Sequence, residues 1–215
     1  MKDFVPLLLN LQEKKVVIFG GGEVGERKAL FFCDYAKVTV VSKEFTGKLS
    51  ELQIKKIIQL IKVNELTETD ISRHLKDAFI VIPATNDMIL NEKIAGIAEN
   101  SGQLVNRVDD LGDVIVPSII RRGDIVIGIS TLGQSPALSK YIRKNIEGVI
   151  TPGLAVMTRL QNEIREMLKS RVGDQKERKE ILWNIMNDSE VWEAINESYE
   201  KAYKVASKHI GKKNE

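Results

Sequence analysis

An apolar strand pattern that runs into closely spaced glycines and then a helical segment most constrains the fold of this chain. Residues 14–20 read KKVVIFG, and Gly20, Gly22 and Gly25 form a G-x-G-x-x-G pattern at the start of the helical segment. In dinucleotide sites the first glycine permits a tight turn, the second admits the pyrophosphate, and the third lets helix and strand pack closely. The helix N-terminus adds free N–H groups and partial positive charge. The motif predicts a nucleotide site; a purely structural turn is the alternative.

The residues around this motif favour an α/β fold with an N-terminal Rossmann-like parallel sheet. Further strand-like runs occur at 37–41, 60–65, 78–85 and 103–108, with helix-like runs between most of them. Such alternation is typical of βαβ units. We therefore expect residues 1–113 to form an NAD-binding Rossmann domain.

The pattern changes after residue 113. Residues 113–131 hold two apolar runs joined by RRGD, which predicts an antiparallel hairpin. Ser135 is a suitable N-cap and Pro136 a suitable first helical residue. Because the apolar hairpin would need covering, we expect a homodimer formed through residues 114–150 and the helical tail. Residues 114–150 are assigned as a dimerisation and substrate region.

Residues 151–215 show helical periodicity without a strand signal and predict a helical C-terminal domain. Several large apolar side chains in this region are expected in its core. They are Leu160, Ile164, Met167, Leu168, Trp183, Ile185, Met186, Trp192 and Ile195.

Composition excludes several classes of protein. The formal net charge of +2 is too small to favour a nucleic-acid partner. Cys33 is the only cysteine, which suits a reducing cytoplasm and excludes an internal disulfide. The apolar N-terminal stretch is too short for a signal peptide or membrane span. We expect a cytoplasmic protein, and no histidine–carboxylate spacing predicts a metal site.

The second strand-like run ends in Ser42, Lys43 and Glu44. An acid at this point often binds the ribose hydroxyls of NAD, whereas a lysine could meet the 2′-phosphate of NADP, so the residues leave the choice open. Thr85 follows the fourth strand and could line the cofactor groove or cap a helix. The candidate cofactor-binding residues are Gly20, Gly22, Glu23, Val24, Gly25, Ser42, Lys43, Glu44 and Thr85.

Three aspartates follow the fifth strand, at the sheet edge where ligands meet the cofactor in such folds. A carboxylate there can accept a proton as a substrate loses hydride. Asp113 is best interpreted as a turn residue, and Asp109 follows the strand more directly than Asp110 does. Asp109 is therefore the candidate catalytic residue.

Hydroxyl and basic side chains gather beside these aspartates and in the region after them. They could bind a polycarboxylate, or they could form an ordinary solvated basic face. The candidate substrate-binding residues are Arg107, Thr131, Ser135, Lys140 and Arg143.

The segments VVIFGGGEVGERKALFFCDYAKVTVV, ATNDMILN, NRVDDLGDVIVPSIIRRGDIVIGIST and LGQSPALSKYIRKNIE together resemble the siroheme-synthase dehydrogenase family. The resemblance covers residues 4 to about 150. It implies NAD-dependent oxidation of precorrin-2 to sirohydrochlorin, with insertion of Fe2+ in some members. It also implies that one aspartate, matching Asp109, serves both steps, and that 114–150 crosses to the partner of a homodimer.

The chain departs from the family pattern at three positions. Thr131 replaces a serine and Leu132 replaces a glycine, which puts regulation or fine positioning by that serine in doubt. Arg107 replaces a small apolar residue beside the aspartate. From the length of the chain we do not expect it to carry the methyltransferase that some relatives have. Two alternative functions are an NAD-sensing module of an ion-transport system and a chelatase with vestigial dehydrogenase activity.

Overall fold

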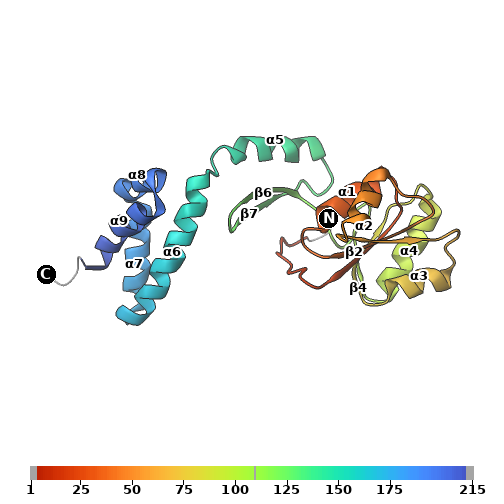
Figure 1. Cartoon of the computed structure of the whole chain (residues 1–215), viewed down its shortest axis with the longest axis horizontal. Coiled ribbons are helices and arrows are strands. Elements are labelled where there is room, and N and C mark those ends of the chain that lie inside the picture. Colours follow the sequence, from red (N-terminus) through yellow and green to blue (C-terminus); the bar gives the residue numbers. More distant parts are fainter. Residues whose placement is uncertain (1–3, 109, 212–215) are drawn as a thin grey trace. The chain divides into compact units, whose positions relative to one another are not determined.

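A computed structural model describes residues 4–108 and 110–211. The chain divides into two compact units, which Figure 1 colours from red to yellow-green and from green to blue. The first comprises residues 4–116 with 132–134, and the second comprises 117–131 with 135–211.

The first unit is built on a parallel sheet with strand order β3-β2-β1-β4-β5. From β1 the chain continues to β2 and β3 on one side of β1. Strand β4 pairs with the other side of β1, so the strand order reverses between β1 and β4. Its elements are β1 (Lys15–Phe19), α1 (Glu23–Phe32), β2 (Lys37–Ser42), α2 (Gly47–Ile54), β3 (Gln59–Lys62), α3 (Glu68–Leu75), β4 (Ala78–Pro83), α4 (Met88–Asn100) and β5 (Leu104–Val105).

Helices cover both faces of this sheet. The side chains of a strand alternate between the two faces, so β1 contributes to the core on each face. Val16 and Ile18 of β1 pack with residues of α1 and α2, whereas Val17 and Phe19 pack with residues of α3 and α4. All four side chains are fully buried. Burial on both faces explains why the central strand has a continuous apolar run instead of an alternating one.

The edge strand β5 is shorter than the expected run at 103–108. The strand ends at Val105, although the Asn106 N–H still donates to Val81 O at 2.9 Å. Beyond it the chain forms a loop that is held by hydrogen bonds from the Val105 N–H to Asp113 at 3.1 Å and from the Asn106 side chain to Val114 O. The third strand also ends earlier than expected, at Lys62.

The second unit begins with the predicted hairpin, formed by β6 (Ser118–Arg122) and β7 (Ile125–Ile129). Arg122 pairs with Ile125, which leaves a two-residue loop whose first residue, Gly123, has φ +57°. A positive φ at that position is what a type II′ turn requires.

Helix α5 (Pro136–Glu147) packs against this hairpin. Ser135 Oγ accepts a hydrogen bond from Leu138 N–H at 3.2 Å, and Pro136 is the first helical residue. The predicted helix start is therefore confirmed.

The remaining helices enclose an apolar core of their own, in which Leu160, Ile164 and Leu168 are fully buried. Trp183 was expected in this core, and that expectation is wrong, because 61% of the residue is exposed. None of the helices in the described ranges combines the length and apolar character needed to cross a bilayer. The helices are α6 (Pro152–Arg171), α7 (Gln175–Met186), α8 (Ser189–Glu197) and α9 (Tyr199–Gly211).

Candidate active site

A groove of about 870 Å3 opens at the carboxyl ends of β1, β2 and β4. In open α/β sheets this is the place where ligands bind, beside the point at which the strand order reverses. The groove is lined by Gly20, Gly21, Gly22, Val41, Ser42, Lys43, Glu44, Phe45, Thr46, Val63, Glu65, Leu66, Ala84, Thr85, Asn86, Asp87 and Leu90.

The three motif glycines have different reasons for being glycine. A Cβ atom on Gly20, where φ is +119°, would lie 2.2 Å from Ala84 O, and one on Gly25 would lie 1.9 Å from Gly20 O. A Cβ on Gly22 would meet no heavy atom of the described residues within 4 Å, its chain neighbours aside. The packing of this chain therefore requires Gly20 and Gly25, whereas Gly22 leaves open space at the groove.

The start of α1 differs from the starts of the other helices in this unit. Thr46, Thr67 and Asp87 each accept a backbone N–H with their side chains at the starts of α2, α3 and α4. At α1 the N-cap is Gly22, and no side chain caps the helix. Open space before an uncapped helix N-terminus suits a bound pyrophosphate, so the residues fit a dinucleotide.

The structure brings most of the predicted cofactor residues to this groove. Those that line it are Gly20, Gly22, Ser42, Lys43, Glu44 and Thr85. The other three, Glu23, Val24 and Gly25, follow in the first turn of α1.

Eleven of the seventeen lining residues were not named as cofactor residues from the sequence, and three of them matter most for the site. Gly21 could have been found from its place in the glycine run, and a Cβ there would lie 2.2 Å from Glu44 O. Glu65 and Asp87 also line the groove. Asp87 occurs in the PATND segment after the fourth strand, but no local motif points to Glu65.

Thr85 has a structural role in the turn that follows β4. Its Oγ1 lies 2.7 Å from Asn91 Oδ1 and accepts the Asp87 N–H at 3.2 Å. Asn91 is buried. Its Oδ1 accepts the Thr85 N–H and its Nδ2 donates to Thr85 O, both at 3.0 Å. Thr85 therefore holds the turn before α4, whose N-cap is Asp87, and it also lines the groove.

The loop that carries the candidate catalytic residue begins at Asn106. Asp109 itself lies outside the described residues. Asn106 is buried and donates from Nδ2 to Val114 O at 2.6 Å, so it joins the two ends of the loop. Asp113 bonds the Val105 N–H, in agreement with its reading as a turn residue. Asp110 Oδ1 accepts the Leu111 N–H at 2.6 Å.

Arg107 is engaged with helix α4 in this structure. Its guanidinium contacts Glu92 Oε1 at 2.6 Å and Glu99 Oε1 at 3.0 Å, and only 18% of the side chain is exposed. The hydrogen bond to Glu92, followed by that to Glu99, raises the pKa of Arg107. Two carboxylates thus already balance the charge that was expected to meet a substrate.

Hydroxyl groups cluster at the start of α5. Thr131 Oγ1 donates to Ser135 O at 2.9 Å and lies 3.1 Å from Ser139 Oγ. Thr131 Oγ1 also accepts the Ser135 N–H at 3.0 Å. The structure thus brings Thr131 and Ser135 together, and it adds the buried Ser139, which the sequence analysis missed.

Basic side chains follow along α5. Lys140 is exposed, whereas Arg143 contacts Glu147 at 2.5 Å. Arg122 of β6 contacts the same carboxylate at 3.3 Å. Two guanidinium groups therefore share one carboxylate, which leaves net positive charge at this point.

Comparison with known proteins identifies the family. A family model described as "Putative NAD(P)-binding" matches residues 7–118. The protein called precorrin-2 dehydrogenase in Methanosarcina barkeri is 49% identical over 218 residues, which cover 99% of this chain and 97% of that protein. This chain belongs to the precorrin-2 dehydrogenase family.

Other members share part or all of this architecture. The siroheme synthase of Zymomonas mobilis is 30% identical over 215 residues, and the match spans 45% of its length. The solved structure named "SirC, precorrin-2 dehydrogenase" covers 97% of this chain with a TM-score of 0.74 and 24% identity. Its likeness confirms the expected fold, a Rossmann-like sheet followed by a hairpin and helices.

Proposed function

We propose that this chain is an NAD-dependent precorrin-2 dehydrogenase, which oxidises precorrin-2 to sirohydrochlorin. The observation that carries the proposal is the 49% identity to a precorrin-2 dehydrogenase across almost the whole of both chains. The open space at Gly22, before an uncapped helix, provides the dinucleotide site that this reaction needs.

NAD is the cofactor that the groove supports. The residues proposed to hold it are Gly20, Gly22, Glu23, Val24, Gly25, Ser42, Lys43, Glu44 and Thr85. Among the described lining residues, Glu44, Glu65 and Asp87 are acidic and Lys43 alone is basic. The acidic side chains repel the additional phosphate of NADP and can accept hydrogen bonds from ribose hydroxyls. Bound NAD supplies the acceptor for the substrate hydride.

Asp109 is proposed as the proton acceptor. Oxidation of the macrocycle removes a proton together with hydride, and a positioned carboxylate can take that proton. The part of the loop that the structure describes is held at both ends, by Asn106 and by Asp113. Asp110, in contrast, already accepts a backbone N–H.

Substrate carboxylates are proposed to meet the hydroxyls and cations of the second unit. Thr131 and Ser135 present a bonded hydroxyl cluster, and Lys140 and Arg143 follow on α5. Arg107, which binds two glutamates, is assigned to holding its loop on α4 and no longer to substrate binding.

A second activity, insertion of Fe2+ into sirohydrochlorin, is included in the proposal. Here Fe2+ is a substrate, and the proposed role of Asp109 is to accept pyrrole protons as the metal enters. Relatives named siroheme synthase support this extension. The described residues contain no group of three metal-binding side chains, and a metal that passes through as substrate needs no such group.

A cytoplasmic homodimer is the proposed assembly. Leu138 and Tyr141 lie one turn apart on α5 with 47% and 64% exposure, and Val149 just after the helix is 70% exposed. Such apolar surface next to a two-stranded hairpin favours covering by a second copy. Sedimentation at micromolar concentration should give the mass of a dimer, and a monomer would contradict this part of the proposal.

The decisive experiment measures NADH formation from precorrin-2 by wild type, Asp109→Asn and Asp110→Asn. Loss of a positioned general base costs about 10²–10⁴-fold in rate, so Asp109→Asn should lower kcat by that amount with NAD affinity kept. Asp110→Asn is the matched control and should be milder.

Three results distinguish the proposed function from its alternatives. Near wild-type oxidation by Asp109→Asn would overturn the catalytic assignment. NAD binding by wild type without turnover would favour the sensor alternative. Iron insertion into sirohydrochlorin by the same proteins tests the second activity separately.

A further inference from the structure

A second groove, of about 380 Å3, lies between α6 and α7 within the helical part of the second unit. One wall comes from α6, where Gln161, Arg165 and Lys169 stand four residues apart and so share one helix face. The other wall comes from one face of α7. Its residues are Gln175, Arg178, Lys179, Leu182, Trp183 and Met186.

One end of this groove is strongly cationic. Arg165, Lys169, Arg178 and Lys179 line it, and the described lining residues include no acid. Glu166 contacts Lys169 at 2.6 Å and offsets part of that charge. The remaining cations favour an anionic ligand.

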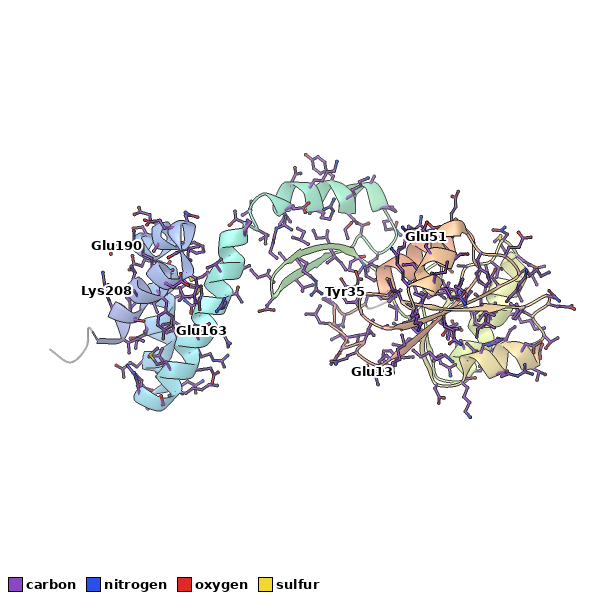
Figure 2. All side chains as sticks on the ribbon, viewed as in Figure 1. Glu13, Tyr35, Glu51, Glu163, Glu190 and Lys208 are labelled. Atoms are coloured by element: carbon purple, nitrogen blue, oxygen red, sulfur yellow. The ribbon has the colours of Figure 1, made fainter. Side chains whose placement is uncertain are left out.

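The acid Glu163 of α6, labelled in Figure 2, does not reduce the charge of the groove. It bonds Arg159 at 3.1 Å, and Arg159 lies 4.2 Å from the ring centroid of Tyr199 on α9. Glu163 therefore belongs to the face of α6 that meets α9, not to the face that meets α7.

Two groove side chains are held in place by hydrogen bonds to the backbone. Arg178 Nη1 donates to Val172 O at 2.6 Å and to Gly173 O at 2.9 Å. Gln161 Nε2 donates to Leu182 O at 3.0 Å. These bonds fix the groove walls before a ligand arrives, which lowers the entropic cost of binding.

The other end of the groove is aromatic and apolar. Trp183 is 61% exposed, and in the described part of α6 to α9 it is the only large hydrophobic residue that is exposed. Half-buried Leu182 and Met186 lie beside it on α7. An exposed indole next to a cationic surface provides a flat face on which a conjugated ring can stack.

We propose that the groove between α6 and α7 is a ligand site for a planar anion. The conjugated part of the ligand stacks on Trp183, and its carboxylates or phosphates meet Arg165, Lys169, Arg178 and Lys179. The volume falls in the range of small-molecule sites, although part of a large ring would project into solvent. This site goes beyond the proposed dehydrogenase function and does not depend on it.

The test is calorimetric titration of the full chain with saturating NAD, which keeps nucleotides out of the sheet groove. Uroporphyrin I represents a carboxylated macrocycle, ADP represents a nucleotide, and citrate supplies carboxylates without a ring. Two groove variants are compared with wild type: Arg165→Gln/Lys179→Gln and Trp183→Leu. The double variant Lys204→Gln/Lys208→Gln removes the same charge from α9 and serves as the control.

Both groove variants should weaken binding of uroporphyrin I or of ADP about tenfold, since each removes one of the two recognition elements. The control should bind like wild type, and Trp183→Phe, which keeps a ring, should restore most of the affinity. Whichever probe loses affinity identifies the source of the anion. Equal weakening in the control, unchanged affinity in both groove variants, or citrate binding as tight as that of the ringed probes would overturn the proposal.

Discussion

The ammonium of Lys28 donates a 2.7 Å hydrogen bond to Oδ1 of Asn106, a residue 78 positions later in the chain. Asn106 also donates its backbone N–H to Val81 O at 2.9 Å and its side-chain amide to Val114 O at 2.6 Å. Burial, with a smaller contribution from Arg27, lowers the pKa of Lys28. These bonds connect α1 and β4 to both ends of the loop that carries Asp109.

Lys28→Met should therefore lower turnover without abolishing cofactor binding. The variant leaves Asn106 Oδ1 without its buried donor, and a displaced loop can cost about 10²-fold in rate. The measurement is kcat for NADH formation beside the Kd for NAD. Arg27→Met removes a neighbouring exposed charge and is the control. A Lys28→Met protein with wild-type kcat would show that the bond has no part in positioning the loop.

Two glycine substitutions should separate binding from folding. Gly22→Val places its side chain in open space at an extended φ of −82°, so the protein should fold but lose NAD affinity. Gly25→Val would drive a Cβ to 1.9 Å from Gly20 O and should unfold the domain. Thermal unfolding and NAD titration of both variants check this. Unchanged NAD affinity in folded Gly22→Val would contradict the pyrophosphate assignment.

The acids of the groove should determine cofactor preference. Glu44→Gln/Glu65→Gln removes two of the three acids that line it, so the ratio of kcat/KM for NAD to that for NADP should fall. We expect a change of about tenfold, since a lost charge–hydroxyl contact costs roughly 1.5 kcal/mol. Glu51→Gln, on the exposed surface of α2 (Figure 2), is the control and should leave the ratio unchanged.

Acid should weaken the helical core through Asp188. His209 Nε2 lies 2.7 Å from its Oδ2, and this hydrogen bond is the main reason why the pKa of Asp188 lies below its ordinary value. A lowered pKa in the folded state gives stability above the unfolded pKa of about 3.9, which is lost as pH falls through the folded value.

Asp188→Asn keeps a side chain that can cap α8 but removes the charge. Its unfolding temperature should lie below that of wild type at pH 6, by an amount that corresponds to about 0.2–1 kcal/mol. The difference should shrink as the pH is lowered from 6 to 2, because protonation of Asp188 removes its charge in the wild type as well. A difference that is the same at both pH values would contradict the role of the Asp188 charge.

Local sequence patterns were sufficient to predict much of the fold. The buried run at β1, the glycine motif and the turn at Gly123 each act over a few residues, so their signals are readable in one stretch of chain. The extent of β5 was not predictable, because residues beyond Val105 belong to a loop that is held by contacts eight residues apart, between Val105 and Asp113 and between Asn106 and Val114.

The candidate site was less predictable where partners are distant in sequence. Arg107 stands two positions before Asp109, which suggested a shared ligand, yet it pairs with Glu92 and Glu99 on α4. Glu65 reaches the groove only because β3 lies next to β2 in the sheet. Trp183 follows the helical period but faces outward, and periodicity alone does not decide which face of a helix is covered.

The glycine at the start of α1 has a thermodynamic consequence. A helix that begins without a side-chain cap keeps backbone donors that a bound anion can satisfy, so NAD binds the folded form and has no such partner in the unfolded chain. Linkage then adds about 2.7 kcal/mol to the stability of the domain when free NAD is at 100 times its Kd. The cellular supply of NAD would thus influence how long the folded protein survives, as well as how fast it works.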